Sequence, residues 1–122
     1  MTPVSEDKEI RWLGSSYVDL LAFPRSPRQD VGFQLGKIQA GLEASSWKPF
    51  NEIGAGTREI SISDAVGIFR VMYVAHFDDA IYVLHCFQKK SLLTTKRDKG
   101  IAKARYGAIA STRSSTKAKE NR

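Results

Sequence analysis

The chain has 122 residues, of which 42% are hydrophobic and 26% charged, and its formal net charge is +6. This length and composition favour one soluble domain, and the apolar runs are far shorter than the ~20 residues that a membrane helix needs. The polar, acidic start lacks the features of a secretory signal, so we expect a cytoplasmic protein. A single cysteine, Cys86, excludes an intrachain disulfide and a Cys-rich metal cluster.

The positive charge lies in the last quarter of the chain. Residues 1–95 hold 10 Lys and Arg against 11 Asp and Glu, a net charge of −1, whereas residues 96–122 hold 9 against 2, a net charge of +7. A concentrated positive segment attracts polyanions and acidic proteins. It is equally typical of a segment that only improves solubility.

The first half of the sequence predicts a strand followed by two helices. We expect residues 1–7 to be disordered and residues 8–13 to form a strand, because apolar side chains alternate there. A short helix over 16–22 is expected to begin at Ser16, to bury Tyr17, Leu20 and Leu21, and to stop before Pro24. A second helix should begin after Ser26, with Pro27 in its first turn.

The second helix is expected to bury one apolar stripe, formed by Val31, Leu35, Ile38 and Leu42. The glycines at positions 32, 36 and 41 weaken this helix. They either permit the close approach of another backbone or are merely tolerated.

The second half predicts a sheet and a last helix. Residues 44–56 are expected to form a loop, and 57–63, 68–77 and 80–87 to form three strands joined by short turns, hence antiparallel neighbours. A helix over 98–110, capped by Asp98, should follow, and the polar tail 111–122 is expected to be disordered. The fold class is therefore α+β: one domain over 8–110, with two N-terminal helices packed on a small twisted antiparallel sheet and a C-terminal helix.

Motifs for metal, cofactor or nucleophilic chemistry are absent from the sequence. Two histidines without an HExxH or CxxC pattern do not make a metal site, so we expect neither a metal nor a cofactor. No GxSxG motif marks a hydrolase. His85 and Cys86 are neighbours on a predicted strand and should point to opposite faces, which argues against a Cys–His pair.

Basic residues on the predicted strands are the remaining candidates for chemistry. Arg70 stands in a strongly apolar strand, where a guanidinium is costly unless it is paired or faces a groove. It is either the partner of a buried acid, such as Glu59, or a ligand for phosphate. Lys89 and Lys90 end the last strand, and with Arg58 they either line a cationic groove or are solvated edge residues. His85 is either a proton carrier or a core histidine.

Several stretches of the chain resemble the HigB-type, phage-related branch of the RelE/ParE toxin superfamily. They are RWLGSS (11–16), Phe-Pro (23–24), SWKPF (46–50), GAGTREI (54–60), FRVMYVAHFDDAIYVLHCFQKKS (69–91) and the Ala102-x-x-x-Tyr106 spacing. The resemblance implies two N-terminal helices against a twisted antiparallel sheet. It also implies a toxin that cleaves messenger RNA on the ribosome, a helix-turn-helix antitoxin as partner, and operator DNA bound only through that antitoxin.

The resemblance carries roles onto a few positions only. Arg70 matches the strand arginine that contacts the scissile phosphate, Lys89 and Lys90 match the basic end of the last strand, and Arg58 matches a basic position before a Glu-Ile pair. Ser61 stands where this branch often has arginine, which lowers the expected activity. The matching leaves open whether Tyr106 is catalytic or packs.

The expected reaction is metal-independent: the ribose 2′-OH attacks the adjacent phosphorus, and Arg70 stabilises the added negative charge. His85, Lys89 or Lys90 would move the protons. RNA contacts are expected from Arg58 and from the basic segment, at Lys96, Arg97, Lys99, Lys103, Arg105 and Tyr106. Three rival functions stay open: a ParE-like gyrase poison, a catalytically silent protein that binds RNA and an antitoxin, and a generic basic nucleic-acid-binding domain.

Overall fold

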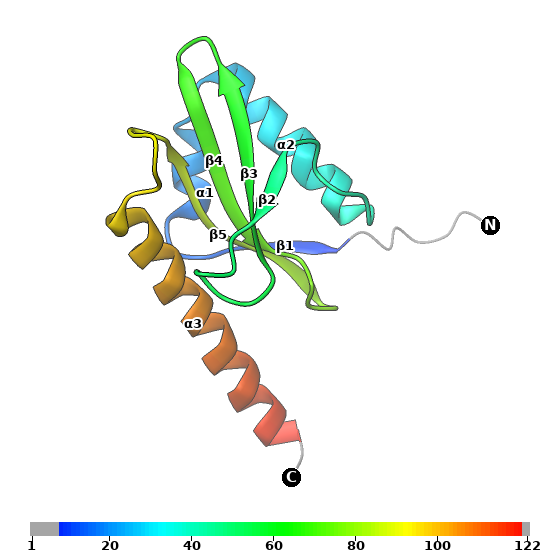
Figure 1. Ribbon diagram of the computed structural model, residues 1–122. Helices are drawn as coiled ribbons and strands as arrows, with labels where there is room; N and C mark the ends of the chain where they lie inside the picture. Colours follow the sequence, from blue (N-terminus) through cyan, green and yellow to red (C-terminus); the bar gives the residue numbers. More distant parts are fainter. Residues whose placement is uncertain (1–7, 121–122) are drawn as a thin grey trace, which may run out of the picture.

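The computed structural model describes residues 8–120 as five strands and three helices around one sheet (Figure 1). The elements in chain order are β1 (Glu9–Trp12), α1 (Ser16–Leu21), α2 (Arg25–Gln39), β2 (Trp47–Pro49), β3 (Thr57–Asp64), β4 (Gly67–Val74), β5 (Ala80–Gln88) and α3 (Lys96–Glu120). The expected α+β class, with helices before and after a small twisted sheet, is confirmed. The segment 1–7, expected to be disordered, lies outside the described residues.

The sheet has the order β1-β5-β4-β3-β2. The three long strands are antiparallel neighbours as predicted, but β1 pairs with β5 in parallel, so the sheet is mixed rather than wholly antiparallel. An alternating pattern fixes which residues of a strand share a face and leaves its partner and direction open. The short edge strand β2, inside the expected loop 44–56, pairs antiparallel with β3.

Helices cover both faces of the sheet, and each face has its own apolar core. Helices α1 and α2 pack on one face with Leu20, Val31 and Leu35, against strand residues such as Ile60 and Val71. Helix α3 lies on the other face with Ala102 and Ile109, among residues that include Met72, Tyr82 and Leu84 (Figure 1). We call these the α1/α2 face and the α3 face.

The beginnings of α1 and α2 differ from the predictions. Ser15 precedes the first residue of α1 and donates its hydroxyl to Asp19 Oδ2 (2.7 Å), whereas Ser16 is buried and donates to the Val83 carbonyl (3.2 Å). Helix α2 begins at Arg25 directly after Pro24, two residues before the expected start. Pro24 adopts an extended backbone (φ −54°, ψ 157°), which suits the residue before a helix.

The burial pattern of these helices also departs from the predictions in part. Leu20 is buried, but Tyr17 and Leu21 are each 47% exposed, because α1 turns only one side to β5. The expected stripe on α2 is buried as far as Ile38, and Leu42 lies beyond the helix and is exposed. A Cβ added at Gly32, Gly36 or Gly41 would meet no heavy atom within 4 Å. Of the two alternatives for these glycines, the close approach of another backbone is therefore wrong, and they are merely tolerated.

Helix α3 begins and ends outside the predicted range. It begins at Lys96, after Thr95 rather than Asp98, because the Thr95 hydroxyl oxygen accepts the Asp98 backbone N–H (3.1 Å). It continues to Glu120 through most of the segment 111–122, which we expected to be disordered. Arg113 ties this extension to the sheet through Asp79 Oδ1 (2.7 Å) and the ring of Phe77. In the described part of the chain, no helix is long and apolar enough to cross a membrane.

Candidate functional site

The α3 face brings three buried charged or titratable side chains together. Glu59 on β3, Arg70 on β4 and His85 on β5 are 0%, 8% and 5% exposed. Strand register places them on one face, since Glu59 and His85 both lie opposite Met72 of β4 and Arg70 is two residues before it. Such groups are rarely buried without a partner, so this face is the candidate site.

Arg70 forms a buried ion pair with Glu59. Its Nη1 donates to Glu59 Oε1, and Lys48 Nζ of the neighbouring strand lies 3.6 Å from the same oxygen. Of the two alternatives that the sequence left open for Arg70, the acid partner is present. Breaking a buried pair of this kind typically costs about 3–5 kcal/mol, so the pair fixes the guanidinium in the sheet.

Unpartnered polar atoms also gather on this face. Five buried side-chain nitrogen or oxygen atoms of the described residues have no hydrogen-bond partner, namely Thr57 Oγ1, Glu59 Oε2, Arg70 Nε, Tyr73 Oη and His85 Nδ1. By register all of them except Tyr73 Oη lie on the α3 face. Buried polar groups are nearly always satisfied in folded proteins, so each of these atoms calls for an explanation, and a catalytic role is one.

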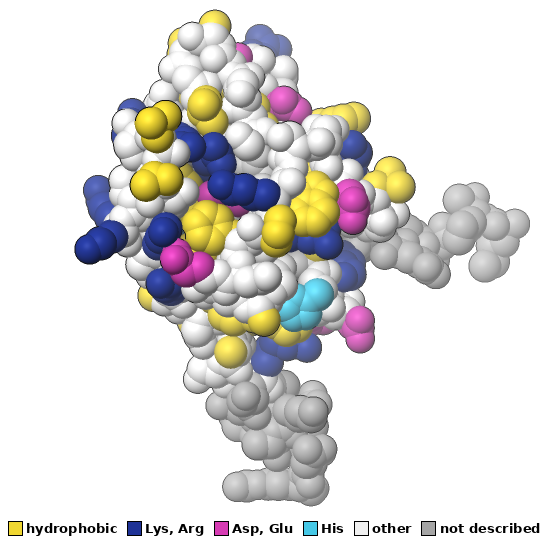
Figure 2. Space-filling model, in the orientation of Figure 1, with side chains coloured by type: hydrophobic (Ala, Val, Ile, Leu, Met, Phe, Trp, Pro, Cys, Tyr) yellow, Lys and Arg dark blue, Asp and Glu magenta, His cyan; other side chains and the backbone are white. Residues whose placement is uncertain are grey.

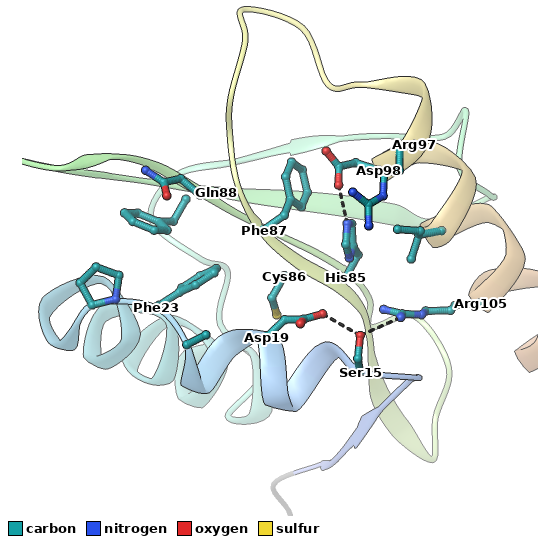
Figure 3. Close-up of a pocket in the computed structure, with 14 residues that line it drawn as sticks. Ser15, Asp19, Phe23, His85, Cys86, Phe87, Gln88, Arg97, Asp98 and Arg105 are labelled. Atoms are coloured by element: carbon teal, nitrogen blue, oxygen red, sulfur yellow. Dashed lines mark hydrogen bonds and ion pairs between the residues drawn. The ribbon is translucent and has the colours of Figure 1, made fainter.

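His85 is oriented by the first turn of α3. Its Nε2 lies 2.8 Å from Asp98 Oδ1 (Figure 3). Asp98 Oδ2 accepts the Thr95 hydroxyl (2.8 Å). The ring also stacks on Phe87, with centroids 4.8 Å apart. A carboxylate that holds an imidazole in one orientation is a recurring feature of acid–base sites.

Lys89 and Lys90 follow the end of β5 at the rim of the site. The Lys89 backbone N–H donates to the Ile68 carbonyl (2.8 Å), so the ladder continues and places the Lys89 side chain on the face of Arg70 and Phe87. The ammonium of Lys90 donates to Gln88 Oε1 (3.2 Å). Figure 2 shows Lys and Arg side chains gathered on this face, across the sheet and beside the start of α3.

Arg58 is not part of this group. Its side chain lies on the α1/α2 face, where the guanidinium stacks 3.8 Å above the Trp47 ring and lies 3.7 Å from Glu43 Oε1. Since neighbouring strand residues alternate, Arg58 and Glu59 point in opposite directions, and the expected convergence of Arg58 with Arg70 is wrong.

The predicted RNA-binding residues of α3 fall into two groups. Lys96, Arg97 and Lys103 are exposed, whereas Lys99 pairs with Glu52 Oε2 (2.9 Å) and lowers the pKa of that carboxyl by hydrogen bonding. Arg105 donates to the Leu84 carbonyl (2.8 Å) and to Ser15 Oγ (3.1 Å).

Tyr106 packs against the glycine-rich loop. Its hydroxyl donates to the Ala55 carbonyl (2.7 Å), and its ring lies where a side chain on Gly54 would be, 2.5 Å from an added Cβ. In this structure Tyr106 therefore has a packing role.

Two residues of the site were not singled out from the sequence. Lys48 belongs to the SWKPF segment, but the loop expected there gave no reason to place it beside Glu59. Asp98 was expected only as a helix cap, and the approach of α3 to β5 gives it His85 as a second partner. In the part of the chain that the structure describes, no three His, Cys, Asp or Glu side chains are grouped as metal ligands would be.

The comparison with protein-family models matches residues 18–107 to the model described as Phage derived protein Gp49-like (DUF891). The chain belongs to this Gp49-like family. The matched segment runs from α1 to Gly107 of α3 and includes every residue of the site. No curated protein matches the chain. Membership of the Gp49-like family supports the coarser expectation of a phage-derived, toxin-like protein.

Proposed function

We propose that this Gp49-like protein is the toxin of a type II toxin–antitoxin pair and cleaves messenger RNA on the ribosome without a metal. The observation that carries the proposal is Arg70: a guanidinium fixed inside a sheet, on a face where Lys48 and Lys89 add positive charge. A rigid guanidinium among ammonium groups is suited to a phosphodiester, because its planar fork binds phosphate oxygens.

The reaction would begin with attack of the ribose 2′-OH on the adjacent phosphorus and yield a 2′,3′-cyclic phosphate and a 5′-hydroxyl. Negative charge then grows on the phosphate oxygens, where Arg70 stabilises it. Glu59 engages Nη1 of Arg70 and Nε is buried, so Nη2 is the guanidinium nitrogen that the phosphate would meet. Glu59 also lowers the net charge that the phosphate meets, which fits an enzyme that needs the ribosome to orient its substrate.

His85 is the favoured group for moving protons in this reaction. Its orientation by Asp98 and its position on the Arg70 face suit a general acid or base. Lys89 and Lys90, which follow the end of β5 at the rim of the site, are the alternatives.

The exposed cations at the start of α3 would contact ribosomal RNA phosphates. The partner that restrains the toxin would be a helix-turn-helix antitoxin, through which the pair reaches operator DNA. Both contacts would require a cytoplasmic protein.

One observation favours a second function. Arg70 is neutralised by Glu59, and Ser61, opposite Arg70 in the register, supplies no second charge. A protein with this face would bind RNA and its antitoxin with little cleavage.

The test is induction of the chain in bacteria, with mapping of RNA ends and a growth curve. Arg70→Lys keeps a charge for Glu59 but loses the planar fork, so we expect RNA cleavage to fall by about 100-fold, in the range found when one stabilising donor is removed. Lys89→Ala combined with Lys90→Ala should also lower cleavage. The matched control is Lys37→Ala, which removes a half-buried lysine of α2 on the other face.

Transcripts cut within codons by the native chain, and spared by Arg70→Lys, support the ribonuclease. Growth arrest with DNA damage and intact transcripts would instead identify a gyrase poison. RNA binding without arrest or cut ends would identify the silent protein.

A further inference from the structure

Strand β5 has an edge without a neighbouring strand. Residues 9–12 of β1 pair with residues 80–83 of β5, and the last backbone bond there runs from Leu13 N–H to the Val83 carbonyl (3.0 Å). Gly14 then takes a left-handed conformation (φ +53°), and the chain leaves the sheet to form α1. Residues 84–88 of β5 therefore have a strand on one side only.

The backbone groups that face this open edge follow from the register. Ile68 lies opposite Lys89 and accepts its N–H (2.8 Å), so the residues of β5 that bond to β4 are His85 and Phe87. The N–H and C=O of Cys86 and Gln88 point the other way, away from β4. The Leu84 carbonyl, at the near end of the edge, is already bound by Arg105.

A cavity of about 440 Å³ lies along this edge, between α1 and α3 (Figure 3). Phe23, Phe69 and Phe87 give it apolar walls, and Asp19 and Arg97 add a carboxylate and a guanidinium. Arg97 has no acidic side chain within ion-pair distance among the described residues. His85 also lines the cavity and has a buried ring nitrogen without a partner.

The geometry favours a small planar ligand over an added peptide strand. An added strand needs a series of backbone N–H and C=O groups that point outward from the edge. Here only Cys86 and Gln88 offer such groups, and Arg105 already binds the next carbonyl, that of Leu84. The cavity is a slot between α1 and α3, and Cys86 in its wall is only 2% exposed, so a ligand that reaches the backbone there must be thin. A nucleobase fits such a slot, because its edge carries donors and acceptors that match a peptide N–H and C=O, and its faces pack against aromatic side chains.

We infer that this cavity holds one unstacked nucleobase of the RNA, with its edge on the backbone of Cys86 and Gln88 and its phosphate on Arg97. The inference rests on the proposed function and adds to it the element that selects the sequence of the RNA. His85 and Phe87 form both a wall of the cavity and a part of the α3 face, so the base lies beside the phosphodiester that Arg70 would contact.

The test is binding of mononucleotides to the full chain, followed by NMR of the backbone amides. AMP, GMP, CMP and UMP are titrated separately, and ribose 5-phosphate serves as the probe for phosphate alone. We expect at least one mononucleotide to shift the amides of Cys86 and Gln88 and to bind at least ~10-fold more tightly than ribose 5-phosphate, which corresponds to one good base contact.

Three variants locate the binding. Ala22 lines the cavity, so Ala22→Trp should fill it and abolish the shifts of the Cys86 and Gln88 amides. Val18→Trp adds the same side chain on α1 outside the cavity and should leave these shifts unchanged. Arg97→Ser, at an exposed position, should weaken binding even if Ala22→Trp does not fold.

Four results overturn the inference: no mononucleotide shifts these amides, ribose 5-phosphate shifts them equally, both tryptophan variants bind alike, or the amides respond only to a protein partner. Binding is measured without ribosomes, so it is independent of cleavage. If no mononucleotide binds in the cavity but the chain still cleaves RNA, only this inference is wrong. If the chain binds a nucleotide in the cavity but does not cleave RNA, only the proposed cleavage is wrong.

Discussion

The two faces of the sheet differ in what they bury. The α1/α2 face is filled by aliphatic and aromatic side chains, and Arg58, its charged strand residue, lies partly exposed at the rim. The α3 face buries Glu59, Arg70 and His85 beside its apolar cluster and holds four of the five unpartnered polar atoms. Burial of charge costs free energy that apolar packing does not, so the α3 face is the one whose buried side chains reduce stability, as the proposed site would require.

The same contrast separates the helices. Helix α2 contributes Val31, Leu35 and Ile38 to its face as a continuous stripe. Helix α3 contributes fewer apolar residues and is held instead by polar contacts, among them Asp98 to His85 and Arg113 to Asp79. Helix α3 is therefore the helix whose position should respond most to changes of charge.

Removal of the buried cation should have the largest effect on folding. Arg70→Ala leaves Glu59 buried with only Lys48 near it, and we expect the free energy of unfolding to fall by about 3–5 kcal/mol. Chemical denaturation followed by circular dichroism measures this change.

The matched variant for this measurement is Arg70→Met combined with Glu59→Gln. It removes both charges, so most of the stability should return while RNA cleavage stays lost. If Arg70→Ala is as stable as the native chain, the pair does not fix the guanidinium and the comparison of the faces fails.

Truncation of a buried apolar side chain on the α1/α2 face should lower the free energy of unfolding somewhat less and should leave RNA cleavage unchanged. Leu35 is 2% exposed, and Leu35→Ala should lower the free energy of unfolding by about 2–5 kcal/mol. At a temperature where the variant is folded, its RNA cleavage should equal that of the native chain. A loss of cleavage in the folded variant would mean that the α1/α2 face also shapes the site.

Much of the fold could be predicted from the sequence because periodicity determines elements and faces. The strands around Ile60, Val71 and Val83 and the stripe of α2 follow from it. The parallel pairing of β1, the edge strand β2 and the extension of α3 depend on contacts between distant segments, such as Arg113 with Asp79. Local patterns carry no information about such contacts.

The site could be predicted only in part, for a related reason. Arg70 stands out because a charge interrupts an apolar strand, and the sequence predicts two alternative partners for it, of which the structure shows the acid, Glu59. The displacement of Arg58 to the other face follows from alternation alone, whereas the meeting of Asp98 with His85 depends on how α3 packs. A register irregularity between Met72 and Tyr73, opposite residues 83–85, further changes which residues of β5 share a face.

The smallest effect concerns Cys86, a buried residue of β5 in the apolar cluster of the α1/α2 face. Burial, with the nearby Asp19 carboxylate as a second cause, raises the pKa of its thiol from 9.0 to about 12. The folded chain thus favours the neutral thiol, and this contribution is fully present below pH 9 and is lost as the pH rises from 9 towards 12. At pH 10 the native chain should lose on the order of 1 kcal/mol that a Cys86→Ala variant does not lose.

Alkylation of the same thiol gives an independent measurement. At pH 8 the thiolate fraction of folded Cys86 is roughly 1000-fold below that of the unfolded chain, so iodoacetamide should label the native protein far more slowly than the protein in denaturant. Rapid labelling of the native chain would show that the slot beside β5 opens in solution. An open slot would favour a wider ligand than a single base at this edge.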